Sequence, residues 1–272
     1  MAPATKVTVV DNHVLRNLSH GAPPKPPEGS TWDFGEAQEV QPKSFPKGCG
    51  ERRNTSGIVQ GTHMSTPDAD VAEASRRYFN RWAPRYDHSV ARIWFRENHR
   101  LLVQAVEPSA DARILDLGCG TGQLAARLAQ RVPHGIVVGV DPAEEMIRVA
   151  RRQHRRKNLS FEVGSSAAIP AGAAAFDVVV STISFHHWTR PVESLREITR
   201  VLGPEGRLLI LDFCRDSLFM AALDHVQRWL QPSHVGIASA NEMRRYFSRA
   251  GFHRLRITQP RWLLMLAEGS SG

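Results

Sequence analysis

The sequence predicts an α/β protein, built as a doubly wound, seven-stranded and mostly parallel sheet with helices on both faces. Short runs such as IVVGV at 136–140 and LLIL at 208–211 are apolar at every position, which is typical of parallel strands buried on both faces. Longer stretches between such runs carry apolar residues at helical spacing. This regular alternation of strand and helix favours the doubly wound class.

Each predicted element follows from its own pattern. Seven runs rich in aliphatic residues are predicted strands: 112–118, 136–141, 159–164, 176–183, 206–213, 253–259 and 261–268. The last two are expected to form a hairpin around Gln259-Pro260. Amphipathic stretches are predicted helices: 69–82, 88–106, 122–132, 143–156 and 191–202. A further helix is predicted in SANEMRRYFSRAGF, where Ser239 and Glu242 have capping-box spacing and Gly251 ends the helix.

Two regions are expected along the chain. Residues 1–63 are rich in Gly and Pro, as in GAPPKPPEGS at 21–30, and such a composition buries too little apolar surface to offset the entropy of ordering. We expect them to be a disordered N-terminal extension or leader, and residues 64–272 to form one folded domain. Whether Met64 is the natural first residue or residues 1–63 are a native arm stays open.

Composition places the chain among ordinary globular proteins. Hydrophobic residues make up 42% and charged residues 23% of it, and no run approaches the ~18 apolar residues of a transmembrane helix. The N-terminus lacks the pattern of a secretory signal. The three cysteines, Cys49, Cys119 and Cys214, are too scattered for a metal site, so we expect no metal. We also expect a reducing, cytoplasmic location.

Much of the net charge of +8 lies in the run from Arg148 to Lys157. A solvated helix face explains such a run, and a footprint for nucleic acid or an anionic membrane surface is the alternative. Peripheral membrane contact therefore stays open. A nucleic-acid partner is disfavoured because no aromatic-rich basic platform accompanies the charge. No pattern indicates the oligomeric state.

The stretch DARILDLGCGTGQLAAR at 111–127 covers the turn between the first predicted strand and the next helix. Gly118, Gly120 and Gly122 stand at alternate positions there, which suits a turn where a ligand approaches bare backbone. A dinucleotide site prefers the spacing G-x-G-x-x-G, whereas here Asp116 precedes the glycines and disfavours a phosphate. We therefore expect a ligand that carries positive charge.

Asp141 ends the second predicted strand, 25 residues after Asp116. This separation is close to that of a carboxylate that accepts hydrogen bonds from ribose hydroxyls. A ribose together with a tail that bears ammonium and sulfonium groups describes S-adenosylmethionine. Two acids in register with a bare turn therefore predict this cofactor.

These residues resemble the class I S-adenosylmethionine-dependent methyltransferases, whose fold is Rossmann-like. The resemblance covers about residues 70–265 and rests on ILDLGCGTG, VVGVDPAEEMIRVARR, FDVVVSTISFHHW and LREITRVLGPEGRLLILDF. It implies that Asp116 and Gly118 hold the methionine part of the cofactor. It also implies that Gly120 lies beneath the cofactor and that Asp141 binds the ribose hydroxyls.

Further cofactor contacts are implied by the same resemblance. Gly122 completes the glycine turn, and Pro142 and Met146 are candidates to pack against adenine, with core packing as the alternative for Met146. The acidic residue usual after the third strand falls on Ser165, whose hydroxyl can still accept a hydrogen bond from an exocyclic amine. Ser181, at the end of the fourth strand, completes the expected cofactor-binding residues.

The stretch YFNRWAPRYDHSV at 78–90 resembles the helical entry of the quinone-biosynthesis C-methyltransferases and related small-molecule enzymes. In that group an aromatic residue of the tyrosine–aspartate pair closes over the cofactor, and this role falls on Tyr86. Arg81 and Trp82 are candidates for the same lid. The alternative is a helix that packs its aromatic residues onto the sheet.

We therefore expect an enzyme that transfers a methyl group to a carbon or oxygen nucleophile of a small molecule, with an apolar phenolic or quinol-like substrate. Such transfer needs a general base only where the attacking atom carries a proton. His186 and His187 follow the fourth strand and are the candidate bases. RNA or another nucleic acid is the alternative acceptor, and a non-catalytic cofactor-binding protein is a third alternative.

The segment 214–236 follows the fifth strand and has helical periodicity. Six of its apolar residues are expected either to roof an apolar substrate pocket or to pack in the core: Leu218, Phe219, Leu223, Val226, Trp229 and Leu230. Both alternatives follow from the same spacing. Asp212, at the end of the fifth strand, is a candidate to face the substrate.

Overall fold

The computed structural model describes residues 67–88, 91–230 and 234–271; the extension expected at residues 1–63 lies outside these ranges. One seven-stranded sheet has the order β3-β2-β1-β4-β5-β7-β6. Its strands are β1 (Arg113–Leu117), β2 (Ile136–Asp141), β3 (Leu159–Val163), β4 (Phe176–Thr182), β5 (Leu202–Phe213), β6 (His253–Arg261) and β7 (Leu264–Ser270). Neighbouring strands pair in parallel from β3 through β2, β1 and β4 to β5, and β7 pairs antiparallel with β5 and β6. The predicted doubly wound, mostly parallel sheet is confirmed.

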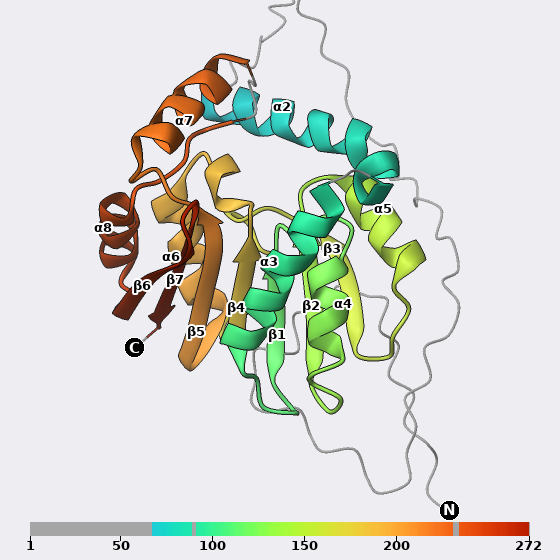
Figure 1. Ribbon diagram of the computed structural model, residues 1–272. Coiled ribbons are helices and arrows are strands. Elements are labelled where there is room, and N and C mark those ends of the chain that lie inside the picture. The colour runs from blue at the N-terminus through green and yellow to red at the C-terminus, as the bar shows by residue number, and fades with distance from the viewer. Residues whose placement is uncertain (1–66, 89–90, 231–233, 272) are drawn as a thin grey trace, which may run out of the picture.

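Helices cover both faces of this sheet (Figure 1). The helical elements are α2 (Pro67–Trp82), η1 (Ala83–His88), α3 (Ala91–Val106), α4 (Gln123–Ala129), α5 (Glu144–Gln153), η2 (Phe185–His187), α6 (Pro191–Val201), α7 (Leu218–Leu230) and α8 (Ala240–Ala250). α2 crosses above the edge where the parallel strands end (Figure 1). Within the described ranges, no helix is both long and apolar enough to cross a membrane.

Two buried clusters hold the layers together. One contains residues of α3, α4 and α5, and the other contains residues of α6 and α8. Successive residues of a strand point to opposite faces, so Ile114 belongs to the first cluster and its neighbour Leu115 to the second. Full burial of such a side chain stabilises the fold by about 1.5–3 kcal/mol, which explains why the central strands carry apolar residues on both faces.

The C-terminal hairpin turns at a different place from the one expected. β6 continues past Gln259-Pro260 to Arg261, and the turn falls on Trp262 and Leu263. Pro260 is tolerated because β6 is an edge strand, where a missing N–H need not remove a ladder bond. The pairing with β7 is accordingly irregular just before Arg261.

Some predicted helix boundaries also move. The helix expected over 122–132 begins at Gln123, because Gly122 adopts a left-handed φ of 80° and stands before it. It ends at Ala129, and the N–H groups of Gln130 and Arg131 bond to carbonyls three residues back. Such bonds tighten the end of a helix. The helix expected over 88–106 begins only at residue 91, because residues 83–88 form η1.

The capping box expected at the start of α8 is confirmed. Oγ of Ser239 accepts a hydrogen bond from the N–H of Glu242 at 3.2 Å, and the N–H of Ser239 donates to Oε2 of Glu242 at 2.8 Å. Gly251 ends the helix with a φ of 88°, a conformation that glycine adopts without strain. These two local signals set where α8 begins and ends.

The glycine turn after β1 is anchored to β2. The N–H groups of Gly118 and Cys119 both donate to the carbonyl oxygen of Val140, at 2.8 and 3.1 Å. A Cβ on Gly139 would lie 2.6 Å from the ring of Phe161 and 3.0 Å from Sγ of Cys119. The close approach of the turn to β2 therefore requires glycine at position 139.

Gly139→Ala is expected to destabilise the protein, because the new methyl group overlaps Phe161 and Cys119. Overpacking of this kind costs about 1–3 kcal/mol, and thermal unfolding followed by circular dichroism measures it as a lower Tm. Gly203→Ala is the matched control, since a Cβ there meets its nearest atom at an ordinary 3.5 Å. Equal Tm values for the two variants would contradict the packing role of Gly139.

Candidate active site

The order of the strands reverses between β1 and β4, which lie side by side at the centre of the sheet. From β1 the chain proceeds outward to β2 and β3, and from β4 it proceeds the other way to β5. Loops that leave neighbouring strands in opposite directions open a cleft at the carboxyl ends. The predicted site residues lie near the carboxyl ends of β1, β2 and β4, on the loops after β1 to β4, and on the covering segments α2 and η1 (Figure 1).

The three glycines of the turn have different surroundings. All have positive φ, at 75° for Gly118, 53° for Gly120 and 80° for Gly122. A Cβ at Gly118 would overlap Oγ of Ser184, and a Cβ at Gly122 would overlap the ring of Phe161. A Cβ at Gly120 would meet no described atom within 4 Å. Open space beside bare backbone therefore lies at Gly120, whereas Gly118 and Gly122 permit close packing within the protein.

Asp141, at the end of β2, is buried and held by two backbone donors. Its Oδ2 accepts a hydrogen bond from the N–H of Gly120 at 2.9 Å, and its Oδ1 accepts one from the N–H of Ala143 at 2.8 Å. Burial raises the pKa of Asp141 to about 6, against the opposing effect of these two donors. The carboxylate thus joins the glycine turn to the start of α5.

Asp116, in β1, is only 1% exposed. Burial raises its pKa to about 7, the charge of Asp141 adds to the rise, and a hydrogen bond from the N–H of Ala125 opposes it. Among the described residues, Oδ2 of Asp116 has no hydrogen-bond partner. A buried polar atom left unpaired costs about 1–3 kcal/mol, so this oxygen is well suited to accept a donor from a ligand.

Together these features fit the cofactor that the sequence predicts. Gly120 allows close approach of a ligand, Asp116 offers an unpaired oxygen to an ammonium group, and Asp141 offers a carboxylate to hydroxyl groups. A positive charge nearby favours the ionised form of a carboxyl group and so offsets the burial of both acids. The donor set therefore fits a cationic nucleoside such as S-adenosylmethionine.

Tyr86 and Asp87 in η1 lie close to the glycine turn. Oγ1 of Thr121 donates to Oδ1 of Asp87 at 2.8 Å, which ties η1 to the turn. The ring of Tyr86 stacks on that of Phe95, with 5.5 Å between the ring centres. Burial raises the pKa of the Tyr86 hydroxyl far above its usual value, and the charge of Asp141 adds to this rise. The expected lid residue therefore lies near the acid-lined turn.

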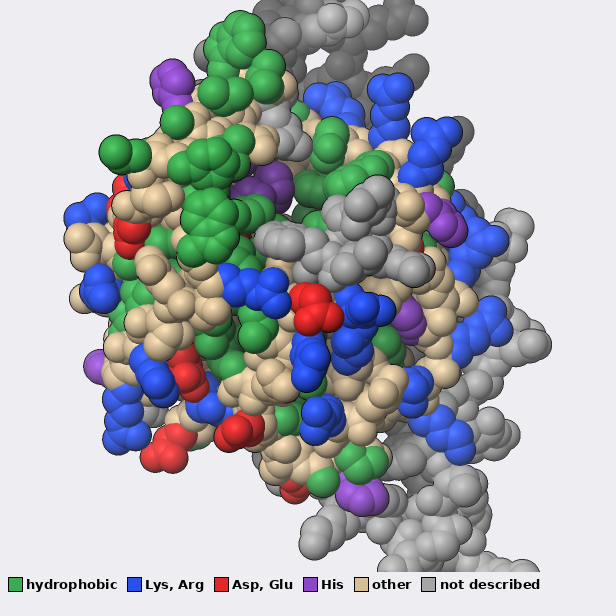
Figure 2. Space-filling view, in the orientation of Figure 1, with side chains coloured by type: hydrophobic (Ala, Val, Ile, Leu, Met, Phe, Trp, Pro, Cys, Tyr) green, Lys and Arg blue, Asp and Glu red, His purple; other side chains and the backbone are tan. Residues whose placement is uncertain are grey.

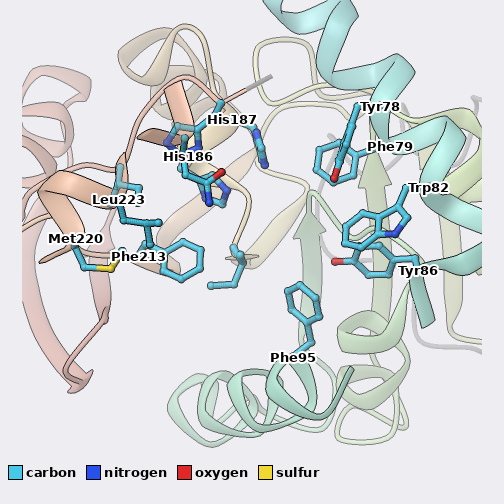
Figure 3. A pocket seen from close by; sticks show the side chains of 14 residues that line it. Tyr78, Phe79, Trp82, Tyr86, Phe95, His186, His187, Phe213, Met220 and Leu223 are labelled. Atoms are coloured by element: carbon cyan, nitrogen blue, oxygen red, sulfur yellow. The ribbon is translucent and has the colours of Figure 1, made fainter. Parts of the chain in front are cut away.

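A cavity of about 220 Å³ opens beside Tyr86. Aromatic side chains of α2, η1 and α3 stand on one side, and residues from the ends of β4 and β5 and from α7 stand on the other (Figure 3). The lining residues are Tyr78, Phe79, Trp82, Tyr86, Phe95, Ile183, His186, His187, Phe213, Met220, Leu223, Gln227, His234 and Ile237. Mostly apolar walls with a few polar groups are typical of small-molecule pockets.

His186 and Asp212 form a buried hydrogen-bonded pair at the wall of this cavity. Nδ1 of His186 lies 2.8 Å from Oδ1 of Asp212, and the N–H of His186 donates to Oδ2 at 3.2 Å. Burial disfavours the charged form of Asp212, but the attraction to His186 and hydrogen bonds outweigh it and lower the pKa. Asp212 therefore holds His186 instead of facing a substrate directly. Its carboxylate accepts from Nδ1–H, which leaves Nε2 unprotonated in the neutral ring.

Two further histidines line the cavity. The ring of His187 meets that of Phe79 edge-on at 5.1 Å and lies 4.1 Å from the ring of His186. Nε2 of His234 lies 2.7 Å from Oδ1 of Asp224, and its ring lies 5.5 Å from that of His186. Burial lowers the pKa of His234. Across the described ranges, no three His, Cys, Asp or Glu side chains form a group that could hold a metal ion.

The loop after β4 carries backbone strain at the cavity. Ile183 has a φ of 51°, a left-handed conformation that a β-branched residue rarely adopts. Its N–H donates to the carbonyl oxygen of Leu211 at 2.8 Å, so pairing with β5 helps to hold this conformation. Strain of about 1–3 kcal/mol per residue is often found at functional sites. Here it directs the chain into η2, which carries His186 and His187.

The remaining predicted cofactor residues lie around the same edge. Pro142 is exposed, Ser165 is half-buried in the loop after β3, and Ser181 is fully buried. The hydroxyl of Ser181 donates to Oγ of Ser184 at 3.4 Å. Met146 is buried in a cluster between α5 and η1, so the core-packing alternative holds for this residue.

The six apolar residues predicted on α7 neither all roof the pocket nor all pack in the core. Only Leu223 of the predicted six lines the cavity, together with Met220. The other five are exposed: Leu218, Phe219, Val226, Trp229 and Leu230. The helix is therefore apolar on two sides, and its spacing alone did not reveal which side faces the protein.

The contributors to the site that sequence reasoning missed include Phe95, His234 and Asp224. Phe95 lies in an ordinary helical pattern, and His234 stands near no motif. Asp224 did carry a signal, because an acid within an otherwise apolar helix needs a partner when it is buried. Its partners include the N–H of Ile237 at 2.7 Å.

The raised pKa of Asp116 predicts that the ligand-free protein loses stability as the pH rises. The usual pKa is 3.8 and the folded-state pKa is about 7, so folding is favoured while Asp116 is protonated. This stabilisation is complete below pH 4 and is lost as the pH rises through 7. Asp116→Asn removes the titration and is expected to raise the free energy of unfolding at pH 8 by roughly 4 kcal/mol.

Chemical denaturation of the ligand-free protein at pH 5 and pH 8 measures this effect. Asp177→Asn serves as the control, since Asp177 stands at the amino end of β4 and pairs with Arg113. A difference between Asp116→Asn and the wild type that is the same at both pH values would refute the titration of Asp116.

Comparisons with known proteins agree with this site. A family model described as a methyltransferase domain matches residues 108–254, more than half of the chain. YcgJ, an uncharacterized methyltransferase of Bacillus subtilis, is 31% identical over 157 residues, which cover 56% of this chain and 61% of that protein. A demethylmenaquinone methyltransferase of Thermus thermophilus is 38% identical over 140 residues, which cover 50% of this chain and 64% of that protein.

A malonyl-[acyl-carrier protein] O-methyltransferase of Geobacter sulfurreducens is 33% identical over 192 residues, which cover 67% of this chain and 71% of that protein. The match thus spans less than two thirds of the length of YcgJ and of the demethylmenaquinone methyltransferase, and more than two thirds of the length of the O-methyltransferase. The crystal structure of YcgJ has a TM-score of 0.54 at 28% identity and covers 60% of this chain and 71% of that chain.

The segment matched by the family model runs from just before β1 into β6. It contains the glycine turn, both buried acids and the His186–Asp212 pair. The chain therefore belongs to the methyltransferase domain family, as a class I S-adenosylmethionine-dependent methyltransferase that resembles the quinone C-methyltransferase group.

Proposed function

We propose that this protein transfers the methyl group of S-adenosylmethionine to an oxygen or carbon nucleophile of an apolar aromatic small molecule, such as a phenol or quinol. The observation that carries the proposal is the His186–Asp212 pair in the wall of an aromatic cavity. This cavity lies beside the acid-lined glycine turn, with Tyr86 near both. The relative named demethylmenaquinone methyltransferase supports an aromatic acceptor of the quinol type.

In this proposal Asp116, Gly120 and Asp141 hold the cofactor. Asp141 accepts hydrogen bonds from the ribose hydroxyls, and the unpaired oxygen of Asp116 accepts one from the ammonium group. When bound, S-adenosylmethionine supplies a methyl group on a positively charged sulfur that is a good leaving group. Tyr86 closes over the turn and keeps water away from the reacting centre.

The acceptor occupies the cavity. Phe79, Trp82 and Phe95 offer ring faces and edges to a flat aromatic molecule, since aromatic pairs favour offset-stacked and edge-to-face contacts. Held in this way, the nucleophile is aligned with the methyl group, and alignment alone supplies much of the rate of a displacement. The protein therefore acts mainly by positioning.

His186 acts as the general base for an acceptor that carries a proton. The proton of the acceptor hydroxyl would move to Nε2 of His186, which would leave the oxygen lone pair available for attack. Asp212 fixes the ring orientation and stabilises the imidazolium that forms. We assign this role to His186 rather than His187 because the hydrogen bond to Asp212 orients the His186 ring.

An acceptor screen tests the proposed function. The full chain is incubated with methyl-labelled S-adenosylmethionine and, in parallel, with phenols, quinols, malonyl-acyl carrier protein, lipids and RNA, and products are followed by mass spectrometry. Labelled product is expected from the phenol or quinol set. Labelling of RNA alone would overturn the proposal in favour of a nucleic-acid acceptor.

Asp141→Ala is expected to weaken cofactor binding while the fold is kept. Each hydrogen bond that a ribose hydroxyl donates to a charged carboxylate contributes about 1.5–3 kcal/mol. Loss of these bonds should therefore lower the affinity for S-adenosylhomocysteine at least ~10-fold. Isothermal titration calorimetry measures the affinity, and circular dichroism checks the fold. Asp177→Asn is again the control, and an unchanged affinity for Asp141→Ala would rule out the ribose assignment.

His186→Gln is expected to lower kcat for a hydroxyl acceptor by about 100-fold or more, with a smaller change in KM. Asp212→Asn should reduce kcat in the same direction, because it removes the carboxylate that orients the ring. His134→Gln is the control, since His134 is exposed before β2. An unchanged kcat for His186→Gln would mean that no base resides there.

A further inference from the structure

α7 has two apolar faces with different surroundings. Met220, Leu223 and Gln227 face inward and line the cavity. On the outer side Leu218 is 92% exposed and Trp229 is 83% exposed. This outer apolar patch consists of Leu218, Phe219, Val226, Trp229 and Leu230, and Trp262 of the β6–β7 turn joins it.

The patch is continuous between two segments far apart in the sequence. The ring of Phe219 lies 5.9 Å from that of Trp262, which is itself 72% exposed. Figure 2 shows hydrophobic side chains gathered over α7, beside a hollow in which histidine is visible. Large apolar residues gathered on one surface mark an interaction site, because scattered single residues are the norm elsewhere.

The two segments that form the patch, α7 and the hairpin around Trp262, carry almost only positive charges. Residues 217–230 and 253–264 hold four arginines and one acid. That acid, Asp224, is buried and bonded to His234, the N–H of Ile237 and Arg228. Arg261, next to Trp262, is exposed. Asp216, two residues before Leu218, is exposed and accepts a hydrogen bond from the N–H of Ala240. With Arg256 and Arg261 exposed as well, cations outnumber acids beside the patch, which is complementary to an anionic surface.

We propose that the outer apolar patch docks on the surface of an anionic lipid bilayer, with Trp229 and Trp262 inserted at the headgroup level. Tryptophan favours this region because its ring is apolar and its N–H is polar. An amphipathic helix that lies in the interface binds through buried apolar area and through attraction to anionic lipids. α7 and the adjacent turn provide both contributions.

A bilayer fits the patch better than two other partners. In a symmetric dimer each patch would face its own copy, which would bring the arginines beside the two patches near one another. Single-stranded nucleic acid stacks its bases on aromatic rings, whereas half of the patch residues are the aliphatic side chains Leu218, Val226 and Leu230. Aliphatic area beside cations therefore favours lipid.

The proposal also has a consequence for the cavity, and this part rests on the proposed function. The same helix that carries the patch lines the acceptor cavity with Met220 and Leu223. Docking through the outer face would place the cavity next to the bilayer, from which an apolar acceptor can enter without crossing water. Membrane docking and methyl transfer are nevertheless separate measurements.

Vesicle flotation of the full chain, without cofactor or acceptor, tests the docking. Wild type is expected to float with vesicles of phosphatidylcholine that contain about one third phosphatidylglycerol, less with phosphatidylcholine alone, and less as salt rises. Trp229→Ser combined with Trp262→Ser should reduce the partition coefficient about 10-fold or more. Arg256→Glu combined with Arg261→Glu should reduce it similarly on anionic vesicles only.

Two controls separate this patch from the rest of the surface. Val163→Ser changes an exposed apolar residue on β3, at the opposite edge of the sheet. Arg155→Glu with Arg156→Glu reverses two exposed charges of the basic run after α5. Both are expected to float like the wild type. The tryptophan variant is checked for an unchanged affinity for S-adenosylhomocysteine, and Leu218→Ser provides a second, independent test.

Three outcomes would overturn the proposal. The first is flotation of the tryptophan variant and of Leu218→Ser at the level of the wild type. The second is loss of flotation in the Arg155/Arg156 variant, which would move the membrane contact to the basic run. The third is a dimer in analytical ultracentrifugation that disappears in the tryptophan variant, which would assign the patch to a second copy. A negative acceptor screen leaves the flotation result standing.

Discussion

Two buried carboxyl groups, Asp116 near the end of β1 and Asp141 at the end of β2, constrain the structure around them. Burial of a charge without a compensating partner is unfavourable. Asp141 is held by two backbone N–H groups, and Asp116 keeps one oxygen unpaired among the described residues. Neither acid receives an arginine or lysine partner at hydrogen-bond distance in those ranges. The fold thus buries two acidic groups at its switch point, and a cationic ligand there would favour their ionised form.

The glycine turn holds these acids by contacts made almost entirely within the backbone. Its N–H groups bond to Val140, Gly120 bonds to Asp141, and Gly139 allows the turn to lie directly against β2. Thr121 extends the connection to Asp87 in η1. The glycine turn and the aromatic cover of the cavity are therefore linked by a hydrogen bond.

Aspartate–histidine pairs recur on the other side of the cavity. Asp212 orients His186, and Asp224 orients His234, whose ring lies 5.5 Å from that of His186. The N–H groups of residues 235 and 236 also donate to the carbonyl oxygen of His186, both at 3.2 Å. The segment after α7 is thus fastened to the proposed base. One helix consequently contributes to the cavity on its inner face and to the exposed apolar patch on its outer face.

The sequence by itself determined the sheet, the glycine turn and the two acids, because strand burial and bare turns leave strong local patterns. ILDLGCGTG and Asp141 were sufficient to indicate a nucleoside site. Only the tertiary structure decided that Asp212 pairs with His186, that Gly122 packs on Phe161 and that α7 exposes Trp229. Each of these depends on neighbours distant in the chain. Helical spacing shows that a helix has apolar positions, but not whether protein or another phase covers them.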